Sequence, residues 1–333
     1  MNKKVVIIGD GAMGTVCGLI LAENAFAVTL WSHSQEQSDN LKTFRENRLF
    51  LPGITLPDSM QFSSCDTDIF QEAEFAVSAV PCAFLRTVWQ RLSPHLPSGL
   101  PILSMTQGIE NISLARPSEI IGASPKSENL ATFSGPNIAD ELTRKLPATS
   151  TVASLDENLA RKFQQAFNTH WLRVYTNSDM IGVELAGATK NVIAIAAGII
   201  DGLGSGDNAK AALLTRGLVE ITRLGVAMGA RQETFIGLSG MGDLITTCVS
   251  PKGRNRTFGQ MLAQGKSVAQ VLAEIPGQVE GVNTCRSLVE LKEKHNVDMP
   301  ITQAVADILF NEKPVTQAIT ELLSRPLKAE STL

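Results

Sequence analysis

A single lysine lies within an apolar stretch of helical periodicity, and its position suggests acid–base chemistry. Between Leu185 and Ile200, the side chains that can ionise or form hydrogen bonds are Thr189, Lys190 and Asn191. A helix this apolar is normally buried on most of its surface, and an unpaired ammonium there is costly. Removal from water favours the neutral amine, so Lys190 becomes a proton donor or acceptor usable near neutral pH. The alternative is that Lys190 emerges on a narrow solvated edge of the helix.

A glycine-rich turn near the N-terminus predicts a dinucleotide site. Three glycines with GxGxxG spacing follow the apolar run Lys4–Ile8 directly. In such turns the first glycine permits the tight bend, the second admits the pyrophosphate and the third allows close helix–strand packing. The N–H groups and dipole of the following helix then favour phosphate. The alternative is a turn without a ligand, but the position after a strand favours a pyrophosphate bound by Gly9, Gly11, Ala12, Met13 and Gly14.

The end of the second strand bears on the choice between NAD and NADP. A site for NAD usually presents Asp or Glu there, which binds the ribose 2′-hydroxyl. This chain has Trp31, Ser32, His33 and Ser34, with no acid before Glu36. A neutral polar tip tolerates a 2′-phosphate, so we expect NAD or NADP, with NADP tolerated or preferred. His33 either contacts that phosphate or is a solvent-exposed loop residue.

Strand and helix patterns alternate over roughly the first 178 residues. Strands are predicted at Lys4–Ile8, Val28–Trp31, Phe75–Val80, Ile102–Thr106, Ala131–Ser134, Thr149–Ala153 and Leu172–Tyr175. This alternation predicts a doubly wound, Rossmann-like and mostly parallel sheet. After Ser178 only helical periodicity follows, which predicts an all-α C-terminal domain. We expect a dinucleotide-binding domain over 1–178 and a helical substrate or catalytic domain over 179–333.

Composition excludes several classes of function. The 333 residues carry a net charge of −4, so no bulk positive field attracts nucleic acid or an anionic membrane. The five cysteines form no CxxC and the four histidines no HExxH, so we expect no metal site. The longest run of apolar residues and glycine, 192–200, is far too short to span a membrane. We therefore expect a soluble cytoplasmic protein without membrane insertion.

Longer blocks of sequence then resemble one family, the NAD(P)-dependent glycerol-3-phosphate dehydrogenases of the bacterial type. Beside the glycine turn, the blocks are NRLFLPGITLP (47–57), SAVP (78–81), SGPNIADE (134–141), the segment from Gly182 to Leu218, GLSGMGDLITTC (237–248), GRNRTFG (253–259) and VEGVNT (279–284). The resemblance implies reduction of dihydroxyacetone phosphate to sn-glycerol 3-phosphate, the precursor of glycerophospholipids. It therefore implies a small phosphorylated substrate and a nicotinamide cofactor.

The resemblance gives Lys190 and Asp243 the central roles. Lys190 matches the family's general acid and base, which protonates the alkoxide during reduction. Asp243 matches the carboxylate that pairs with this lysine and touches a substrate hydroxyl. The alternative for Asp243 is a helix N-cap before Leu244.

Further residues match substrate and cofactor contacts. Arg254 and Asn255 match the phosphate-binding pair, although a solvated charged loop is the simpler reading of that segment. Asn191 and Thr247 are expected as hydrogen-bonding neighbours, and Cys248 as a packed small residue. The cofactor contacts implied by the resemblance include Pro81 and Glu280. The turn where substrate and nicotinamide meet is implied at Gly135, Asn137 and Ala139, and it also reads as a helix start with Pro136 in the first position.

The chain departs from the family pattern at two positions. Gln107 stands where the family has a lysine that touches both cofactor and substrate phosphate, and Gly253 replaces a serine. Loss of a charge-assisted contact costs roughly 1.5–3 kcal/mol. We therefore expect a competent hydride-transfer site with weakened or altered phosphate recognition. The alternatives are a related dehydrogenase with another substrate and a non-catalytic NAD(P)-binding sensor. The apolar segment Ile181–Ile200 can also serve as a homodimer interface.

Overall fold

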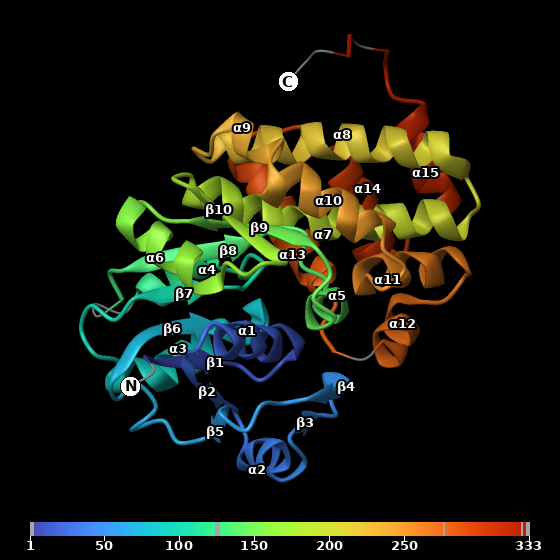
Figure 1. The fold of residues 1–333 in the computed structure, drawn as a ribbon. Helices are drawn as coiled ribbons and strands as arrows, with labels where there is room; N and C mark the ends of the chain where they lie inside the picture. The colour runs from blue at the N-terminus through green and yellow to red at the C-terminus, as the bar shows by residue number, and fades with distance from the viewer. Residues whose placement is uncertain (1–2, 124–126, 276, 328, 331–333) are drawn as a thin grey trace. The chain divides into compact units, whose positions relative to one another are not determined.

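The computed structural model describes residues 3–123, 127–275, 277–327 and 329–330, which form two compact units (Figure 1). The first unit comprises Met1–Thr106 and Pro117–Met180. The second comprises Gln107–Arg116 and Ile181–Leu333. The short segment 107–116 thus leaves the first unit and joins the second. The assignment of cofactor binding to 1–178 and of catalysis to 179–333 stays a prediction.

An eight-stranded sheet is the centre of the first unit. Its order is β10-β9-β8-β7-β6-β1-β2-β5, and every neighbouring pair is parallel except β8 and β9. The prediction of a mostly parallel sheet is confirmed. The strands are β1 (Lys4–Ile8), β2 (Ala27–Trp31), β5 (Gln61–Ser63), β6 (Ala73–Ser78), β7 (Ile102–Ser104), β8 (Leu130–Ser134), β9 (Ala148–Ala153) and β10 (Leu172–Asn177).

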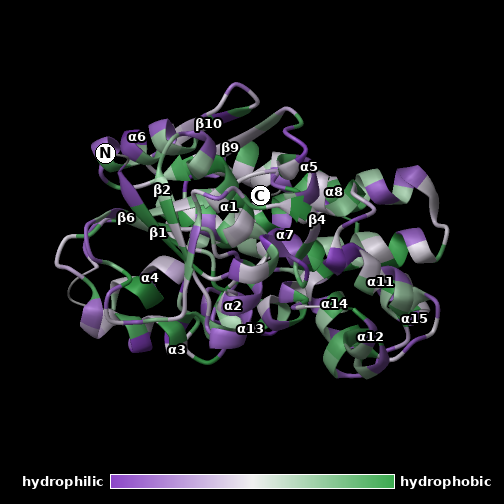
Figure 2. Ribbon diagram, turned by 60° about the horizontal axis from the view of Figure 1, so that its bottom comes forward, coloured by the Kyte–Doolittle hydropathy of each residue, from purple (hydrophilic) through white to green (hydrophobic). Residues whose placement is uncertain are grey.

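The order of the strands reverses at one point of this sheet, beside β1. The chain moves outward from β1 to β2 and β5, then returns to the other side of β1 with β6. Ligands of doubly wound sheets bind beyond the carboxyl ends of the strands at such a reversal. Residues Val5 to Ile8 of β1 are fully buried, and the hydrophobic colouring of the central strands in Figure 2 agrees with a strand covered on both faces.

Helices connect these strands, and a small hairpin follows the second of them. The helices are α1 (Ala12–Glu23), α2 (Gln35–Phe44), α3 (Cys82–Leu92), the 3₁₀ turn η1 (Ser93–His95), α4 (Pro117–Gly122), α5 (Ala139–Thr143) and α6 (Glu157–Phe167). The hairpin pairs β3 (Glu46–Asn47) with β4 (Leu51–Thr55). Sequence analysis missed β3, β4 and β5 because two of them have two or three residues and β4 contains Pro52 and Gly53.

The second unit is helical, as predicted, and after residue 178 its described residues contain no strand. Its helices are α7 (Met180–Gly202), α8 (Gly206–Ala227), α9 (Gln232–Phe235), the π-helical turn η2 (Leu238–Gly242), α10 (Asp243–Val249), α11 (Arg254–Ala263), α12 (Val268–Glu274), α13 (Glu280–Lys294), α14 (Pro300–Phe310) and α15 (Val315–Leu323).

Helix α7 lies in the core of this unit. Buried apolar residues of α8, α10, α11, α13 and α14 belong to the same core. By length and hydropathy alone α7 is able to cross a membrane, but 94% of its most apolar window is buried, which is the burial of a core helix. Because α7 is enclosed by its own unit, the expectation that Ile181–Ile200 forms a homodimer interface is wrong.

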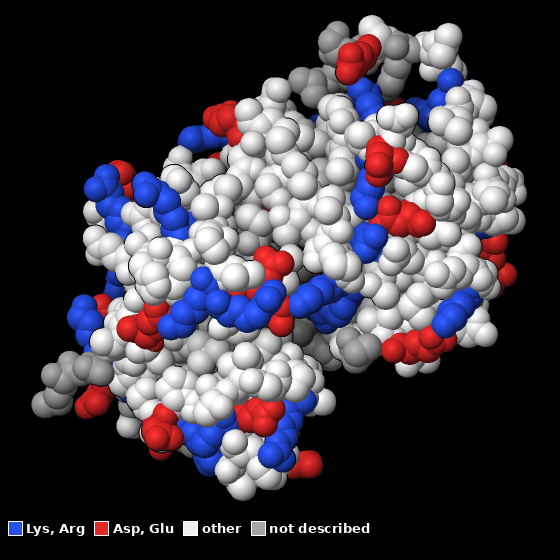
Figure 3. All heavy atoms as spheres, turned by 45° about the vertical axis from the view of Figure 1, so that its right-hand side comes forward, with Lys and Arg blue, Asp and Glu red and all other residues white. Residues whose placement is uncertain are grey.

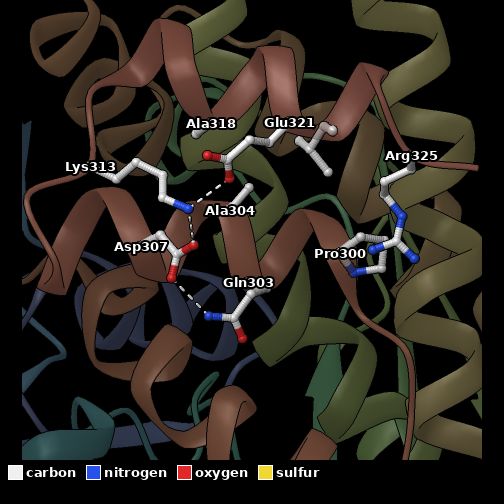
Figure 4. A pocket seen from close by; sticks show the side chains of 9 residues that line it. Pro300, Gln303, Ala304, Asp307, Lys313, Ala318, Glu321 and Arg325 are labelled. Atoms are coloured by element: carbon white, nitrogen blue, oxygen red, sulfur yellow. Dashed lines mark hydrogen bonds and ion pairs between the residues drawn. The ribbon is translucent and has the colours of Figure 1, made fainter.

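Helices α14 and α15 are joined by an ionic cluster beside a shallow pocket (Figure 4). Lys313 pairs with Asp307 and Glu321, each at 2.8 Å. Burial acts to raise the pKa of Asp307, but hydrogen bonds from Lys313, Gln303 and Asn311 outweigh it and lower that pKa. These groups satisfy one another, so the cluster fastens the two helices. On the face shown in Figure 3, Lys and Arg lie among Asp and Glu without one large patch of a single sign.

Candidate active site

Lys190 and Asp243 form a buried pair in the second unit. The Lys190 Nζ is in direct contact with the Asp243 Oδ2. Lys190 is 5% exposed and Asp243 2% exposed. The alternative of a lysine on a solvated helix edge is therefore wrong. A buried ammonium needs a carboxylate partner to offset its lost hydration, and Asp243 supplies it.

An irregular turn presents Asp243 to the lysine. The π-helical turn Leu238–Gly242 precedes α10, and such turns are frequent at functional sites. A Cβ at Gly240 would lie 2.0 Å from the Phe235 carbonyl oxygen, so only glycine permits this packing. Asp243 is the first residue of α10, and Gly242 occupies the N-cap position. The N-cap alternative for Asp243 is therefore wrong.

Two neutral donors complete the surroundings of Asp243. The Gln107 Nε2 donates to Oδ2 at 3.1 Å, and the Thr247 Oγ1 donates to Oδ1 at 3.4 Å. Burial raises the pKa of the Asp243 carboxyl, and the charge of Lys190 with the three hydrogen bonds opposes this rise. The carboxyl thus has a higher proton affinity than one in water and faces an amine at hydrogen-bonding distance.

The segment that carries Gln107 is fastened to the helical unit. The Ser287 Oγ donates to the Ile109 carbonyl oxygen at 3.1 Å. Arg116 and Glu184 form an ion pair at 2.6 Å, in which the Glu184 side chain is fully buried. These contacts fix both ends of 107–116, so Gln107 is held beside Asp243 by the same unit that carries Lys190.

Close helix crossing brings two predicted asparagines together. A Cβ at Gly198 of α7 would lie 1.9 Å from the Arg256 carbonyl oxygen, so glycine allows α7 and α11 to touch. The Asn255 Nδ2 donates to the Asn191 Oδ1 at 3.0 Å, and the Gly281 N–H donates to the Asn255 Oδ1 at 2.9 Å. Asn255 is thus oriented from both sides.

The positively charged side chains of this region are of two kinds, those that form ion pairs within the protein and those that are available to a ligand. Arg256 and Lys210 both bind Asp201, at 2.6 and 2.9 Å. Arg254 is exposed, and the described part of the chain gives it no ion pair. Gly253 is the N-cap of α11 and offers no side-chain hydrogen bond. The charge available to an anion here is therefore that of Arg254. Glu280, the first residue of α13, stands at another helix start.

In the first unit, the glycine turn has the geometry that a pyrophosphate requires. A Cβ at Gly14 would lie 1.9 Å from the Gly9 carbonyl oxygen, and Gly9 has a φ of +108°. A Cβ at Gly11 would meet nothing within 4 Å, so the turn opens onto free space. Helix α1 starts here with Ala12 and Met13 and has no side-chain cap. The residues present therefore fit a dinucleotide phosphate.

Asn47 of β3 supports this turn, a role that sequence analysis missed. Its Nδ2 donates to the Asp10 carbonyl oxygen at 2.7 Å and to the Thr15 Oγ1 at 2.7 Å. Asn47 is fully buried. The only signal in the sequence was its place in a block that resembles the family.

At the end of β2, His33 has a partner that sequence analysis also missed. The Arg91 Nη1 lies 3.1 Å from the His33 Nδ1. Arg91 comes from the last turn of α3, 58 residues away, so no local pattern connects the two. His33 is exposed in a loop, as the alternative reading has it, but Arg91 is its neighbour, and its contact with a 2′-phosphate stays a prediction.

The remaining predicted residues of the first unit lie at starts of helices. Gly135 has a φ of +136°, and the Asn137 Oδ1 accepts a hydrogen bond from the Ser150 Oγ at 2.6 Å. Pro81 is the N-cap of α3, and Ala139 begins α5. Pro136 precedes the N-cap Ile138 by two residues, so its expected place in the first helical turn is wrong.

The predicted residues are divided between the two units. Those of the first unit are Gly9, Gly11, Ala12, Met13, Gly14, His33, Pro81, Gly135, Asn137 and Ala139, and those of the second are Gln107, Lys190, Asn191, Asp243, Thr247, Gly253, Arg254, Asn255 and Glu280. Among the described residues, no three His, Cys, Asp or Glu gather to hold a metal. Cys248 is packed as expected, and burial raises the pKa of its thiol to about 12.

Comparisons with known proteins agree on one family. A family model described as NAD-dependent glycerol-3-phosphate dehydrogenase N-terminus matches residues 4–160, and the corresponding C-terminus model matches 179–320. The glycerol-3-phosphate dehydrogenase [NAD(P)+] of Geobacter sp. (strain M21) is 44% identical over 99% of both chains. That of Streptomyces coelicolor is 43% identical over 98% of both. A crystal structure of glycerol-3-phosphate dehydrogenase from Coxiella burnetii superposes with a TM-score of 0.94 at 34% identity, covering 97% of this chain and 99% of that one.

Proposed function

Because this chain belongs to the NAD-dependent glycerol-3-phosphate dehydrogenase family, we propose that Lys190 is the general acid and base of its reaction. The chain is an NAD(P)-dependent oxidoreductase that interconverts dihydroxyacetone phosphate and sn-glycerol 3-phosphate. The observation that carries the proposal is the contact of the Lys190 Nζ with Asp243 inside an apolar helical core. Burying such a pair is costly, and the apolar core of the unit does not need it in order to fold.

Proton transfer at the substrate oxygen is the step assigned to Lys190. When bound, the reduced nicotinamide supplies a hydride to the carbonyl carbon. The Lys190 ammonium donates a proton to the carbonyl oxygen as negative charge develops there, and the neutral amine takes it back in the reverse reaction. Asp243 orients the amine and stabilises its charged form. Gln107 and Thr247 in turn fix the carboxylate.

Recognition of the substrate phosphate falls to Arg254 and Asn255 in this proposal. An arginine fork suits a phosphate, and Arg254 is exposed at the start of α11. Asn255 is held by Asn191 and Gly281. Gln107 adds a hydrogen-bond donor but no charge. We therefore propose that the phosphate is held with one cation fewer than the family pattern provides.

The cofactor's pyrophosphate is assigned to the turn Gly9–Gly14 and the start of α1. Free space beside Gly11 and an uncapped helix end support this assignment. Glu280, Pro81 and Ala139 stay proposed cofactor contacts. Neither a dehydrogenase for another substrate nor a non-catalytic sensor is favoured by the Geobacter and Streptomyces relatives, which are named glycerol-3-phosphate dehydrogenase [NAD(P)+] and are 41–44% identical.

Substitution Lys190→Ala tests the proposal. We expect kcat/KM for dihydroxyacetone phosphate to fall by about 10²- to 10⁴-fold, since a positioned acid contributes that much. Cofactor affinity, measured by calorimetry, should stay within twofold. Lys294→Ala, which removes an exposed lysine of α13 in the same unit, is the control. Retention of more than a tenth of the turnover in Lys190→Ala would contradict the assigned role.

Three broader properties are also proposals. We infer that the enzyme supplies glycerol 3-phosphate for phospholipid synthesis, that it works in the cytoplasm and that it forms a homodimer. A dimer interface must lie outside α7, because that helix is buried in its own unit. Light scattering of the purified protein measures the oligomeric state directly.

A further inference from the structure

Arg91, Asp66 and Trp31 gather around His33 at the end of β2, and of these four residues only His33 was predicted to contact the cofactor. Arg91 binds Asp66 through Nε at 2.6 Å and faces His33 through Nη1 at 3.1 Å. The Arg91 guanidinium also lies 5.1 Å from the centre of the Trp31 ring. All four residues belong to the first unit, so their arrangement is fixed within that unit.

The guanidinium is held in place with one edge left for a ligand. Its side chain is 36% exposed, and among the described residues its Nη2 has no hydrogen-bond partner. An arginine that is stacked and paired loses little freedom when it binds an anion, because its fork is already oriented. Arg91 is therefore preorganised, whereas a lysine on a free surface is not.

Asp66 already accepts hydrogen bonds from Arg91 and Trp31. It is therefore poorly placed to accept another from a ribose hydroxyl. Its Oδ1 accepts from the Trp31 Nε1 at 3.2 Å, and its Oδ2 accepts from Arg91. Asp10 is the other acid near His33. Burial raises the pKa of the Asp10 carboxyl, which the Ser32 hydroxyl and His33 partly oppose. Both oxygens of Asp66 are thus occupied by protein donors, and burial disfavours the charged form of Asp10.

The place of the cluster identifies the ligand group. In a sheet whose first strand leads into the glycine turn, the ribose of the adenosine half lies at the end of the neighbouring strand. Here that strand is β2, which ends at Trp31, and His33 follows it by two residues. A 2′-substituent would therefore meet a histidine and an arginine fork. Phosphate is the group that this pair recognises best.

We propose that Arg91 and His33 bind the 2′-phosphate of NADP(H), and that Arg91 determines a preference for NADP(H) over NAD(H). Asp66 and Trp31 are positioning residues that hold the guanidinium. The inference rests on the dinucleotide site assigned above and adds the residue that selects between its two ligands. In the sequence, Arg91 belongs to none of the blocks that resemble the family.

Calorimetric binding to Arg91→Gln tests this proposal without turnover. The probes are NADP⁺ against NAD⁺, and 2′,5′-ADP against 5′-AMP, which differs from it only by the 2′-phosphate. We expect Arg91→Gln to weaken NADP⁺ and 2′,5′-ADP by about ten- to a hundred-fold, the worth of a charge-assisted contact. Binding of NAD⁺ and 5′-AMP should change less than twofold.

Arg161→Gln is the matched control, because it removes one positive charge from an exposed ion pair of the same unit. It should leave all four affinities unchanged. Arg91→Lys keeps the charge but loses the planar fork of donors, so we expect an intermediate loss of affinity for NADP⁺. If Arg91→Gln fails to fold, Arg91→Lys tests the proposal in its place. Asp66→Asn should weaken NADP⁺ several-fold through lost orientation.

Several results would overturn the proposal. Equal weakening of NADP⁺ and NAD⁺ in Arg91→Gln would mean a structural role, and an unchanged ratio would mean no role. Weakening of NAD⁺ alone in Asp66→Asn would identify Asp66 as the acceptor for a ribose hydroxyl. Failure of the proposed catalytic role has a different signature, since Lys190→Ala then keeps its turnover whatever the cofactor ratio. Failure of wild type to bind any dinucleotide would overturn the cofactor site as a whole.

Discussion

Two buried carboxyls of the helical unit, Asp243 and Glu220, differ in the partners that the fold gives them. Asp243 faces the Lys190 amine and two neutral side chains. Glu220 lies on α8 and accepts from the backbone N–H groups of Ile301 and Thr302, both at 2.8 Å, and from the Thr302 hydroxyl at 2.6 Å. Both residues are 2% exposed, and burial raises the pKa of each.

Under the proposed function, this difference separates a carboxyl that takes part in the reaction from one that stabilises the fold. Glu220 satisfies the first N–H groups of α14, which begins at Pro300, so its donors are two backbone groups and the Thr302 hydroxyl, none of which titrates. The partner of Asp243 is itself titratable, so a proton can leave or enter the pair. Burial and a raised pKa are therefore common to both carboxyls, and the titratable partner is what distinguishes Asp243 from Glu220.

The largest effect should come from Asp243→Asn, which removes the charge that balances Lys190. We expect kcat/KM for dihydroxyacetone phosphate to fall by about a hundred-fold, because a charge-assisted contact worth about 1.5–3 kcal/mol is lost. Steady-state kinetics of the purified variant measures this. Glu220→Gln changes an equally buried acid and should keep kcat/KM within twofold. Comparable losses in both variants would remove the distinction between the two carboxyls.

Much of this architecture is predictable from sequence because it depends on local pattern. The strands and helices around Gly9–Gly14 follow from alternation and glycine spacing, and the buried Lys190 follows from the apolar residues on either side of it. Of the three missed strands, β3 and β5 are too short for a periodicity to develop, and β4 contains Pro52 and Gly53.

The contact partners of the candidate residues were harder to predict from the sequence. Lys190 and Asp243 are 53 residues apart, and only the family resemblance connected them. Arg91 with His33, Asn47 with Asp10 and Glu220 with α14 are likewise joined by the tertiary fold alone. Sequence pattern gives the elements, whereas a contact between distant side chains requires the register in which those elements pack.

An intermediate effect is expected from Gln107→Lys, which gives Asp243 a cationic neighbour in place of a neutral one. The ammonium restores a charge near the substrate phosphate, so kcat/KM for dihydroxyacetone phosphate should rise at least about tenfold. The gain should be absent for unphosphorylated dihydroxyacetone, measured in parallel. An unchanged value for the phosphorylated substrate would mean that another cation, such as Arg254, already supplies the contact. A loss would mean that the new ammonium displaces Lys190 from Asp243.

The smallest effect concerns the pH dependence of stability that Glu220 contributes. Burial raises the pKa of Glu220 in the folded protein above the ordinary value of 4.5, despite the opposing hydrogen bonds from Thr302 and Ile301. As pH rises above 4.5 the unfolded chain releases this proton first, so the folded state binds more protons and its stability falls until the raised pKa is passed. The slope is at most about 1.4 kcal/mol per pH unit.

Glu220→Gln lacks this titration, so the difference in free energy of unfolding between wild type and variant isolates it. Urea unfolding from pH 4.5 to 7 should show wild type losing its advantage as pH rises, while the contribution of Asp243 cancels because both proteins contain it. Glu293→Gln, which alters an exposed acid of the same unit, should give a flat difference. If the excess free energy of unfolding of wild type over Glu220→Gln grew with pH, the N-terminus of α14 would stabilise the charged carboxylate more than burial disfavours it. Glu220 and Asp243 would then differ in their titration as well as in their partners.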